Sequence, residues 1–149
     1  MTKVCPSGDE RVLLFGQLLE TNARLTRAVN AELEDSCELP LAWFEALLTL
    51  RRTPEGRLRM NEVADSIVLS NGGATRLVDR MEAAGLVERV NCPSDRRAIH
   101  VAITAQGNLK LDEALAVHLE QLSGLISSRL SDAERAQLST LLGKLQRGV

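Results

Sequence analysis

The sequence predicts a mostly α-helical fold with one small β-hairpin. Along most of the 149 residues, apolar side chains recur at intervals of three and four, which is the spacing of one helix face. Residues 86–103 differ, because apolar and polar side chains alternate there as they do in strands. Hydrophobic residues make up 44% of the chain but aromatic residues only 2%, so the core must be aliphatic. This length suits a single domain spanning 1–149.

The first part of the chain predicts two helices separated by a proline. The first is expected over about 9–35, with an apolar face made of Val12, Phe15, Leu18, Leu19, Leu25, Val29 and Leu33. Pro40 interrupts the pattern, and a second helix should run from Leu41 to about Arg52. The next residues, Thr53-Pro54-Glu55-Gly56, have the composition of a loop.

Two short helices are predicted next. Asn61 is expected to cap the first, because its side-chain oxygen accepts an orphan backbone N–H. Ser70 should cap the second, which runs from Asn71 to about Ala84 and ends at Gly85. The inward stripe of this second helix consists of Ala74, Leu77, Val78, Met81 and Ala84. The pair therefore has the pattern of a helix-turn-helix whose second helix turns a polar side outward.

A β-hairpin should follow this helix pair. Residues 86–90 and 99–103 are the two expected strands, and Pro93-Ser94-Asp95-Arg96 has turn chemistry. Proline presets φ in such a turn, and aspartate bonds its own backbone. Thr104 is expected to cap the next helix. The sequence thus predicts a winged helix-turn-helix lobe over about 58–104, with arginines at the protruding tip of the wing.

Residues 105–149 predict further helices that could join two chains. One carries leucines at helical spacing from Leu111 to Leu130, and another begins at the capping box Ser131-Asp132-Ala133-Glu134. Together with 9–35, these helices carry more apolar surface than the small lobe can cover, and soluble monomers rarely expose large apolar patches. A two-fold homodimer of interlocking terminal helices is therefore expected. The alternative is that the helices pack on each other within one chain.

The central residues resemble the MarR (multiple antibiotic resistance regulator) family. The run GLVERVNCPSDRRAIHVAITAQG is similar to the wing signature of that family, and SNGGATRLVDRMEAAG is similar to its recognition helix. The resemblance implies a homodimeric transcriptional regulator, with a small-molecule or oxidant effector acting between the dimer helices and the DNA-binding lobe. One departure is Gly72-Gly73, which weakens a helix start by about 1 kcal/mol per glycine relative to alanine. The same pair would let the backbone approach DNA closely.

The charge distribution favours a duplex DNA partner for this lobe. The whole chain carries a net charge of −2, but the segment from Arg51 to Arg97 holds nine arginines, no lysine and seven acids. Arginine forms bidentate contacts with phosphate and guanine edges, which lysine does not. A dimer would place two recognition helices roughly 34 Å apart, which fits two half-sites of a near-palindromic operator. The expected function is a repressor that a small-molecule effector releases from such an operator.

Each predicted DNA contact has a separate role. Asn71, Thr75 and Arg76 are expected to face base edges, while Ser70 and Arg80 suit phosphates. Gly72 would allow the helix to approach the duplex. Arg97, and secondarily Arg96, should enter the minor groove, and Asp95 should orient an arginine rather than touch phosphate. Taken singly, each arginine could instead be a solvated surface residue.

Regulation has weaker candidates. Trp43 could form a flat wall for an aromatic ligand or simply anchor the core, and His118 could face a pocket or solvent. Cys92 lies near the wing arginines and would suit a thiol-based redox-sensing repressor. The plainer interpretation is three inert thiols, at Cys5, Cys37 and Cys92. Cys37 is expected in an acidic loop, where neighbouring carboxylates raise the pKa of its thiol.

Other function classes find little in the sequence. It contains no glycine-rich phosphate loop, no convincing nucleophile–base arrangement and no metal-ligand spacing, so we expect no enzyme, cofactor or metal site. A winged-helix protein-interaction module stays open as an alternative, and it would lack salt-dependent DNA affinity. No apolar run approaches the roughly 20 residues that span a bilayer. The scattered, odd-numbered cysteines and the absence of a secretory signal favour a cytoplasmic protein without a membrane partner.

Overall fold

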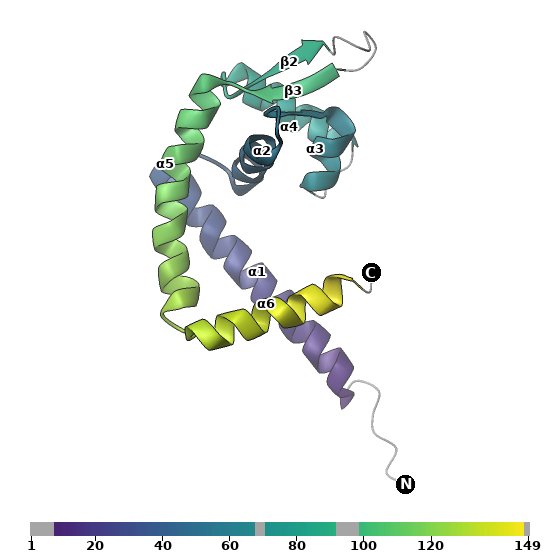
Figure 1. The fold of residues 1–149 in the computed structure, drawn as a ribbon, viewed down its shortest axis with the longest axis vertical. Helices are drawn as coiled ribbons and strands as arrows, with labels where there is room; N and C mark the ends of the chain where they lie inside the picture. Colours follow the sequence, from purple (N-terminus) through teal and green to yellow (C-terminus); the bar gives the residue numbers. More distant parts are fainter. Residues whose placement is uncertain (1–7, 68–70, 92–98, 148–149) are drawn as a thin grey trace. The chain divides into compact units, whose positions relative to one another are not determined.

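The computed structural model describes residues 8–67, 71–91 and 99–147. The chain divides into two compact units, one formed by residues up to Ala31 together with those from Glu120, and the other by Glu32–Leu119. The helices are α1 (Glu10–Cys37), α2 (Leu41–Arg52), α3 (Met60–Ser66), α4 (Asn71–Ala83), α5 (Ala105–Leu122) and α6 (Asp132–Gln146). The strands are β1 (Arg57–Arg59), β2 (Val87–Asn91) and β3 (Ile99–Ile103) (Figure 1). The predicted mostly α fold with a winged helix-turn-helix is confirmed.

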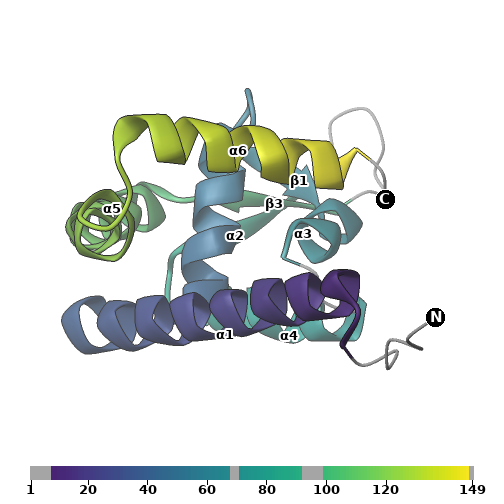
Figure 2. The same ribbon diagram turned by 90° about the horizontal axis from the view of Figure 1, so that it is seen from below.

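The Glu32–Leu119 unit is built on a three-stranded antiparallel sheet in the order β1-β3-β2. The hairpin register pairs Val87 with Ile103 and Arg89 with Val101. On the other side of β3, Leu58 of β1 pairs with Val101. Figure 2 shows α2 and α3 beside β1 and β3. Strand β1 was not predicted, because three residues are too few to display a strand period.

The start of α3 corrects one expectation. Asn61 is not its cap: α3 begins at Met60, and Arg59 occupies the capping position. The Glu62 carboxylate reaches back and accepts a hydrogen bond of 2.7 Å from the Arg59 backbone N–H. A glutamate three positions into a helix commonly makes this contact. It stabilises the earlier start and leaves Asn61 inside the helix.

The end of α4 matches the prediction at Gly85. This glycine has φ of +75°, in the left-handed region where a residue without Cβ is favoured. The Gly85 N–H donates to the Glu82 carbonyl at 2.9 Å, and the Leu86 N–H donates to the Met81 carbonyl at 3.0 Å. These two bonds form a Schellman motif, which satisfies the last carbonyls of the helix and turns the chain into β2.

A second glycine fixes the junction between β3 and α5. Thr104 caps α5 as predicted, because its hydroxyl oxygen accepts a hydrogen bond of 2.9 Å from the Gly107 N–H. The same hydroxyl donates to the Gly85 carbonyl at 2.7 Å. A Cβ atom added to Gly107 would overlap the Leu86 carbonyl oxygen. The Thr-x-x-Gly spacing therefore lets α5 begin directly against the chain that enters β2.

The core of this unit is aliphatic, as the composition predicts. Its largest fully buried side chains include Leu33, Leu39, Leu47, Leu50, Met81 and Leu111. They come from α1, the α1–α2 junction, α2, α4 and α5, and Val87 of β2 and Val101 of β3 are buried as well, so the helices and the sheet share one hydrophobic core. Phe44 of α2 is also buried. This common core holds α4 in place from behind.

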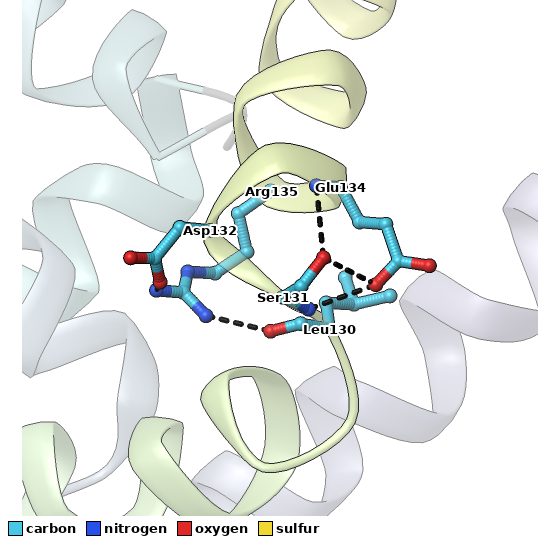
Figure 3. Close-up of polar contacts among 5 residues, drawn as sticks. All are labelled: Leu130, Ser131, Asp132, Glu134 and Arg135. Carbon is cyan, nitrogen blue, oxygen red and sulfur yellow. Dashed lines mark hydrogen bonds and ion pairs between the residues drawn. The ribbon is translucent and has the colours of Figure 1, made fainter.

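The other unit consists of helical segments with little buried surface. Val29 is its only buried hydrophobic residue among those described. The Gln121 side-chain amide donates to the Ala28 carbonyl at 2.8 Å, which joins α5 to α1. The expected capping box of α6 is confirmed: Ser131 Oγ accepts from the Glu134 N–H, and the Glu134 carboxylate accepts from the Ser131 N–H (Figure 3).

The long helix expected to carry leucines as far as Leu130 is interrupted. After α5 ends at Leu122, residues Ser123–Ser127 form a π-helix. The Ser128 N–H accordingly donates to the Ser123 carbonyl at 2.9 Å, five residues back. Ser123 and Gly124 are weak helix formers, which explains why the regular pattern relaxes there. Within the described ranges, no helix is both long and apolar enough to cross a membrane.

Candidate nucleic-acid interface

Helix α4 exposes the side that the sequence predicts to be polar. Its inner face buries Ala74, Leu77, Val78 and Met81 in the core. Ala84, which was expected on the same stripe, is exposed because α4 ends at Ala83. Thr75, Arg76, Asp79 and Arg80 are exposed on the remaining surface. Because a helical side chain shares its face only with residues three or four positions away, burial of one stripe fixes the direction of the other. Two arginines therefore project from a helix whose position is set by the core.

Arg80 is supported by Trp43 of α2. The guanidinium carbon of Arg80 lies 5.6 Å from the centre of the Trp43 ring, a cation–π geometry. Both side chains border a cavity of about 240 Å³, which Pro40, Gly73 and Arg76 also line. Trp43 is half-buried. Trp43 is thus neither fully buried in the core nor fully exposed to a ligand. Its contact with Arg80 could not be predicted from the spacing of residues in the sequence.

Arg89 of β2 ties the wing to the recognition helix. Its guanidinium makes ion pairs of 2.5 Å with both Asp79 and Glu82 of α4. Its backbone N–H also donates to the Glu82 carboxylate at 3.0 Å. Burial acts to lower the pKa of Arg89, but the hydrogen bonds and charges of Asp79 and Glu82 outweigh it and raise that pKa. The charge of Asp79, which would otherwise repel phosphate, is therefore compensated inside the lobe.

The ion pairs of Arg89 with Asp79 and Glu82, called the clamp below, were not predicted from the sequence, where Asp79 and Arg89 entered the charge balance of the segment. A usable signal was present, because an acidic residue on the outward face of a proposed DNA-binding helix needs a nearby cation. Of the seven arginines in that segment that the structure describes, three form ion pairs with carboxylates: Arg51 with Asp112, Arg57 with Glu55, and Arg89 as described. Fewer arginines of this segment are therefore available to bind phosphate than the total number of arginines indicates.

Several predicted contacts lie outside the described residues. These are Ser70 before α4 and, in the wing, Asp95, Arg96 and Arg97; the redox candidate Cys92 also lies outside them. The backbone of Asn71 and Gly72 begins α4, but their side chains also lie outside the description. Their proposed roles stay predictions. Thr75, Arg76 and Arg80 are the predicted contacts whose side-chain exposure is known.

The regulatory candidates have distinct environments. His118 of α5 packs against Phe44, with ring centres 4.9 Å apart, and burial lowers the pKa of its imidazole. Its buried Nδ1 has no hydrogen-bond partner among the described residues. His118 is therefore half-buried, with its ring against Phe44.

Cys37 also differs from its expected setting. It is the last residue of α1, not part of a loop, and its side chain is buried. Burial is the main cause that raises the pKa of its thiol, and the charge of Glu113 adds to it. The direction is as predicted, but the local acidic residues are not the principal reason. Among the described residues, no cluster of three or more His, Cys, Asp or Glu could hold a metal ion.

Comparison with known proteins gives a consistent result. Residues 38–98 match a model of the MarR family. Over 139 residues, the chain is 25% identical to the HTH-type transcriptional regulator PecS of Dickeya dadantii (strain 3937), covering 93% of this chain and 82% of PecS. It is 33% identical over 102 residues to the transcriptional repressor MprA of Escherichia coli (strain K12), covering 68% of this chain and 57% of MprA.

A solved structure of the same kind shares the whole fold. The crystal structure of a mutant MarR from Escherichia coli, complexed with operator DNA, superposes with a TM-score of 0.78 at 25% identity. The alignment covers 91% of this chain and 95% of that one. The sequence signatures, the exposed arginine face of α4 and these comparisons together show that the chain belongs to the MarR family of DNA-binding transcriptional regulators.

Proposed function

We propose that this protein is a homodimeric repressor that binds a near-palindromic operator and leaves it when an effector binds. The observation that carries the proposal is the outward face of α4, where Thr75, Arg76 and Arg80 stand opposite a buried stripe. An α-helix fits the major groove of B-form DNA, and side chains on its outer face then meet base edges and phosphates. The operator complex of the similar MarR structure supports the same use of this fold.

Within this proposal, the contacts divide by chemistry. Asn71, Thr75 and Arg76 read base edges, and Ser70 and Arg80 bind phosphates. Gly72 allows close approach of the helix. At the wing, Arg97 and Arg96 enter the minor groove, and Asp95 orients one of them. Arg89 contributes indirectly, because its ion pairs to α4 hold the base of the wing against the helix.

Dimerisation supplies the spacing between half-sites. Large apolar side chains are exposed on α1 and α6, among them Phe15 at 62% and Leu145 at 53%. A second copy of the chain would cover these residues, since soluble proteins rarely leave such patches open. Two recognition helices roughly 34 Å apart would then address two half-sites one helical turn apart. An effector acts by shifting the population of dimers that has this separation.

The test is operator binding as a function of salt. Genomic fragments retained by the purified protein would identify an operator, which is then used in fluorescence anisotropy. Arg76→Ala should lower the affinity for the operator about 10- to 100-fold and relax base preference, as expected for a lost bidentate contact of about 1–3 kcal/mol. Arg97→Ala should weaken binding chiefly to A·T-rich minor-groove flanks. Arg129→Ala, on the exposed surface of the other unit, is the matched control.

Two outcomes would contradict the proposal. Parent-like affinity of both variants at physiological salt would remove the assigned contacts. An affinity that does not change with salt would favour a protein-interaction module instead, because phosphate contacts release counterions and make binding salt-dependent. A redox-sensing repressor is the second alternative, and mild peroxide tests it: oxidation of Cys92 should then weaken operator binding. Unchanged affinity with fully oxidised thiols would exclude it.

A further inference from the structure

We infer that Trp43 is a positioning residue of the DNA interface: its indole ring holds the Arg80 guanidinium in the place where that group meets a backbone phosphate of the duplex. Trp43 belongs to α2, which precedes the helix-turn-helix and carries none of the DNA contacts assigned above. The inference rests on the proposed function, because it concerns how tightly the protein binds DNA. Its first test needs no DNA.

The two arginines of the exposed α4 face repel each other. Arg76 and Arg80 stand one helical turn apart, so their side chains leave the helix on the same side. Like charges at this spacing are unfavourable. Both side chains are exposed, and a free arginine adopts many rotamers in water. An arginine that is disordered in the free protein must be ordered when DNA binds, which lowers affinity.

The acidic residues of α4 do not hold Arg80 in place. Asp79 and Glu82 both pair with Arg89. Arg80 has no ion pair with a carboxylate among the described residues. The cavity of about 240 Å³ beside Arg76 and Arg80 also has no acidic residue in the part of its lining that the structure describes. The positive charge of both arginines is therefore left for phosphate.

Trp43 provides the contact that orders Arg80. The centre of its ring lies 5.6 Å from the guanidinium carbon, and the π-electrons attract the cation electrostatically. A ring face leaves the in-plane N–H donors of the guanidinium free, and these are the donors that bind a phosphate in bidentate fashion. A carboxylate would occupy such donors, as Asp79 and Glu82 do for Arg89. Trp43 thus orders an arginine without neutralising it.

The position of Trp43 itself is set by the core. Its backbone N–H donates to the Pro40 carbonyl at 2.9 Å in the first turn of α2. Phe44 and Leu47, which follow in the same helix, are buried and anchor α2 in the lobe. The indole has few rotatable bonds, so keeping it ordered costs little conformational entropy. The ring is therefore a fixed support for a side chain that is otherwise flexible.

The first experiment tests the contact in the free protein. Trp43 is the only tryptophan of the chain, so the fluorescence spectrum reports its surroundings alone. Arg80→Gln removes the cation from the ring and should shift the emission. Arg52→Gln removes an exposed arginine at the far end of α2 and should not. Identical spectra of the parent and Arg80→Gln would overturn the inference, because the ring and the guanidinium would then not meet.

The second experiment is a double-mutant cycle on DNA affinity. A labelled duplex of random sequence at low salt is the probe, because phosphate contacts do not depend on base sequence. Trp43→Leu should weaken binding about two- to fivefold per chain, the size of an exposed cation–π contact. The same substitution should have no effect in the Arg80→Gln background. An equal loss in both backgrounds would show that Trp43 acts only through the stability of the lobe, and would overturn the inference.

Two further readouts separate positioning from a general structural role. Arg80→Gln should lower the salt dependence by about one phosphate contact per chain, whereas Trp43→Leu should leave it unchanged, since the charge of Arg80 remains. Trp43→Phe keeps an aromatic face and should lose less affinity than Trp43→Leu. Leu48→Ala truncates another half-buried α2 side chain, outside the cavity, and should bind the duplex like the parent. Equal losses in Trp43→Phe, Trp43→Leu and Leu48→Ala would contradict the role of the ring.

The outcomes distinguish this inference from the proposed function. If the parent binds the duplex and Trp43→Leu binds equally well, only the role of Trp43 is wrong. If the parent binds no duplex even at low salt, the proposed function is wrong, and the role of Trp43 in DNA binding falls with it, whatever the fluorescence shows.

Discussion

The two units of the chain differ sharply in how they treat their hydrophobic residues. The Glu32–Leu119 unit buries nearly all of the core, including Leu47, Leu50 and Leu111, at most 1% exposed. In the other unit only Val29 is buried among the described residues. That unit instead exposes Val12, Leu13, Leu14, Phe15, Leu19, Leu138, Leu141, Leu142 and Leu145.

The difference indicates that one unit is stabilised by contacts within the chain, whereas the other needs contacts with a partner. The winged lobe owes its stability to contacts within the chain, so its geometry is set before any partner arrives. The terminal helices have leucines at helical spacing but few partners for them, which is the pattern of a subunit interface. Changes in the two units should therefore affect different measurements, and four predictions test this in order of expected effect.

The largest effect is expected from a charge placed in the terminal helices. Leu141→Glu on α6 should convert the proposed dimer into monomers, because a buried unpaired carboxylate at an interface costs several kcal/mol. Operator affinity should fall about 100-fold or more, since one chain then contacts one half-site. Sedimentation velocity measures the oligomeric state, and circular dichroism checks that the lobe stays folded. Gln137→Glu introduces the same charge at an exposed polar position of α6 and should leave the dimer intact. A parent that sediments as a monomer would contradict the comparison itself.

The next effect concerns packing inside the lobe. Gly107→Ala would bring a Cβ onto the Leu86 carbonyl oxygen, so α5 must shift away from the entry to β2. We expect the free energy of unfolding to fall by about 2–3 kcal/mol, as for overpacked cores. Urea denaturation measures it. Gly124→Ala is the matched control, because nothing lies within 4 Å of its Cβ position, and its stability should be unchanged or slightly higher. Equal stability of the two variants would show that the close approach at Gly107 is not required.

A smaller effect is expected at the clamp between wing and helix. Arg89→Met leaves Asp79 and Glu82 without their cation and should reduce the free energy of unfolding by about 1 kcal/mol, since the pair is only partly buried. Operator affinity should fall as well, because Asp79 then faces phosphate uncompensated. Arg57→Met breaks a more local ion pair, with Glu55, and should cost less than half as much. If both variants lose the same stability, Arg89 has no special role in joining β2 to α4.

The smallest effect is a pH dependence from His118. Burial lowers the pKa of its imidazole in the folded state, so the unfolded chain binds the proton more readily. The stability contributed by neutral His118 is full above the unfolded pKa of about 6.5 and is lost as pH falls towards the lower folded pKa. Between pH 7.5 and 5.5, the parent should lose about 0.5 kcal/mol more than His118→Phe, because the ring stays partly exposed. Parallel urea titrations at several pH values measure this difference, and identical pH profiles would rule it out.

Local signals in the sequence were sufficient for much of the fold. Pro40 and the Thr53-Pro54 pair bracket α2, and the observed helix has the predicted bounds. Gly85 and Ser131 likewise ended and began helices where their backbone and capping chemistry require. The predicted start of α3 at Asn61 was wrong, because the Glu62 carboxylate accepts a hydrogen bond from the Arg59 N–H and stabilises an earlier start.

Less of the candidate site than of the fold could be predicted from local sequence signals. Helical periodicity placed Arg76 and Arg80 on the exposed face of α4. It could not reveal that Arg80 lies over Trp43 or that Arg89 binds Asp79, because these pairs depend on how separate elements pack. The three-residue strand β1 was missed for the same reason, since its existence depends on pairing with β3.

The ion pairs of Arg89 also bear on which DNA shapes this protein would accept. Because they join β2 to α4, we expect the base of the wing and α4 to move together when the lobe binds DNA. In an over- or undertwisted duplex, the base pairs that α4 contacts and the groove that the wing contacts would be rotated relative to each other. Such a duplex could then bind α4 or the wing, but not both at once. Such a lobe would therefore respond to torsional strain in the chromosome as well as to base sequence.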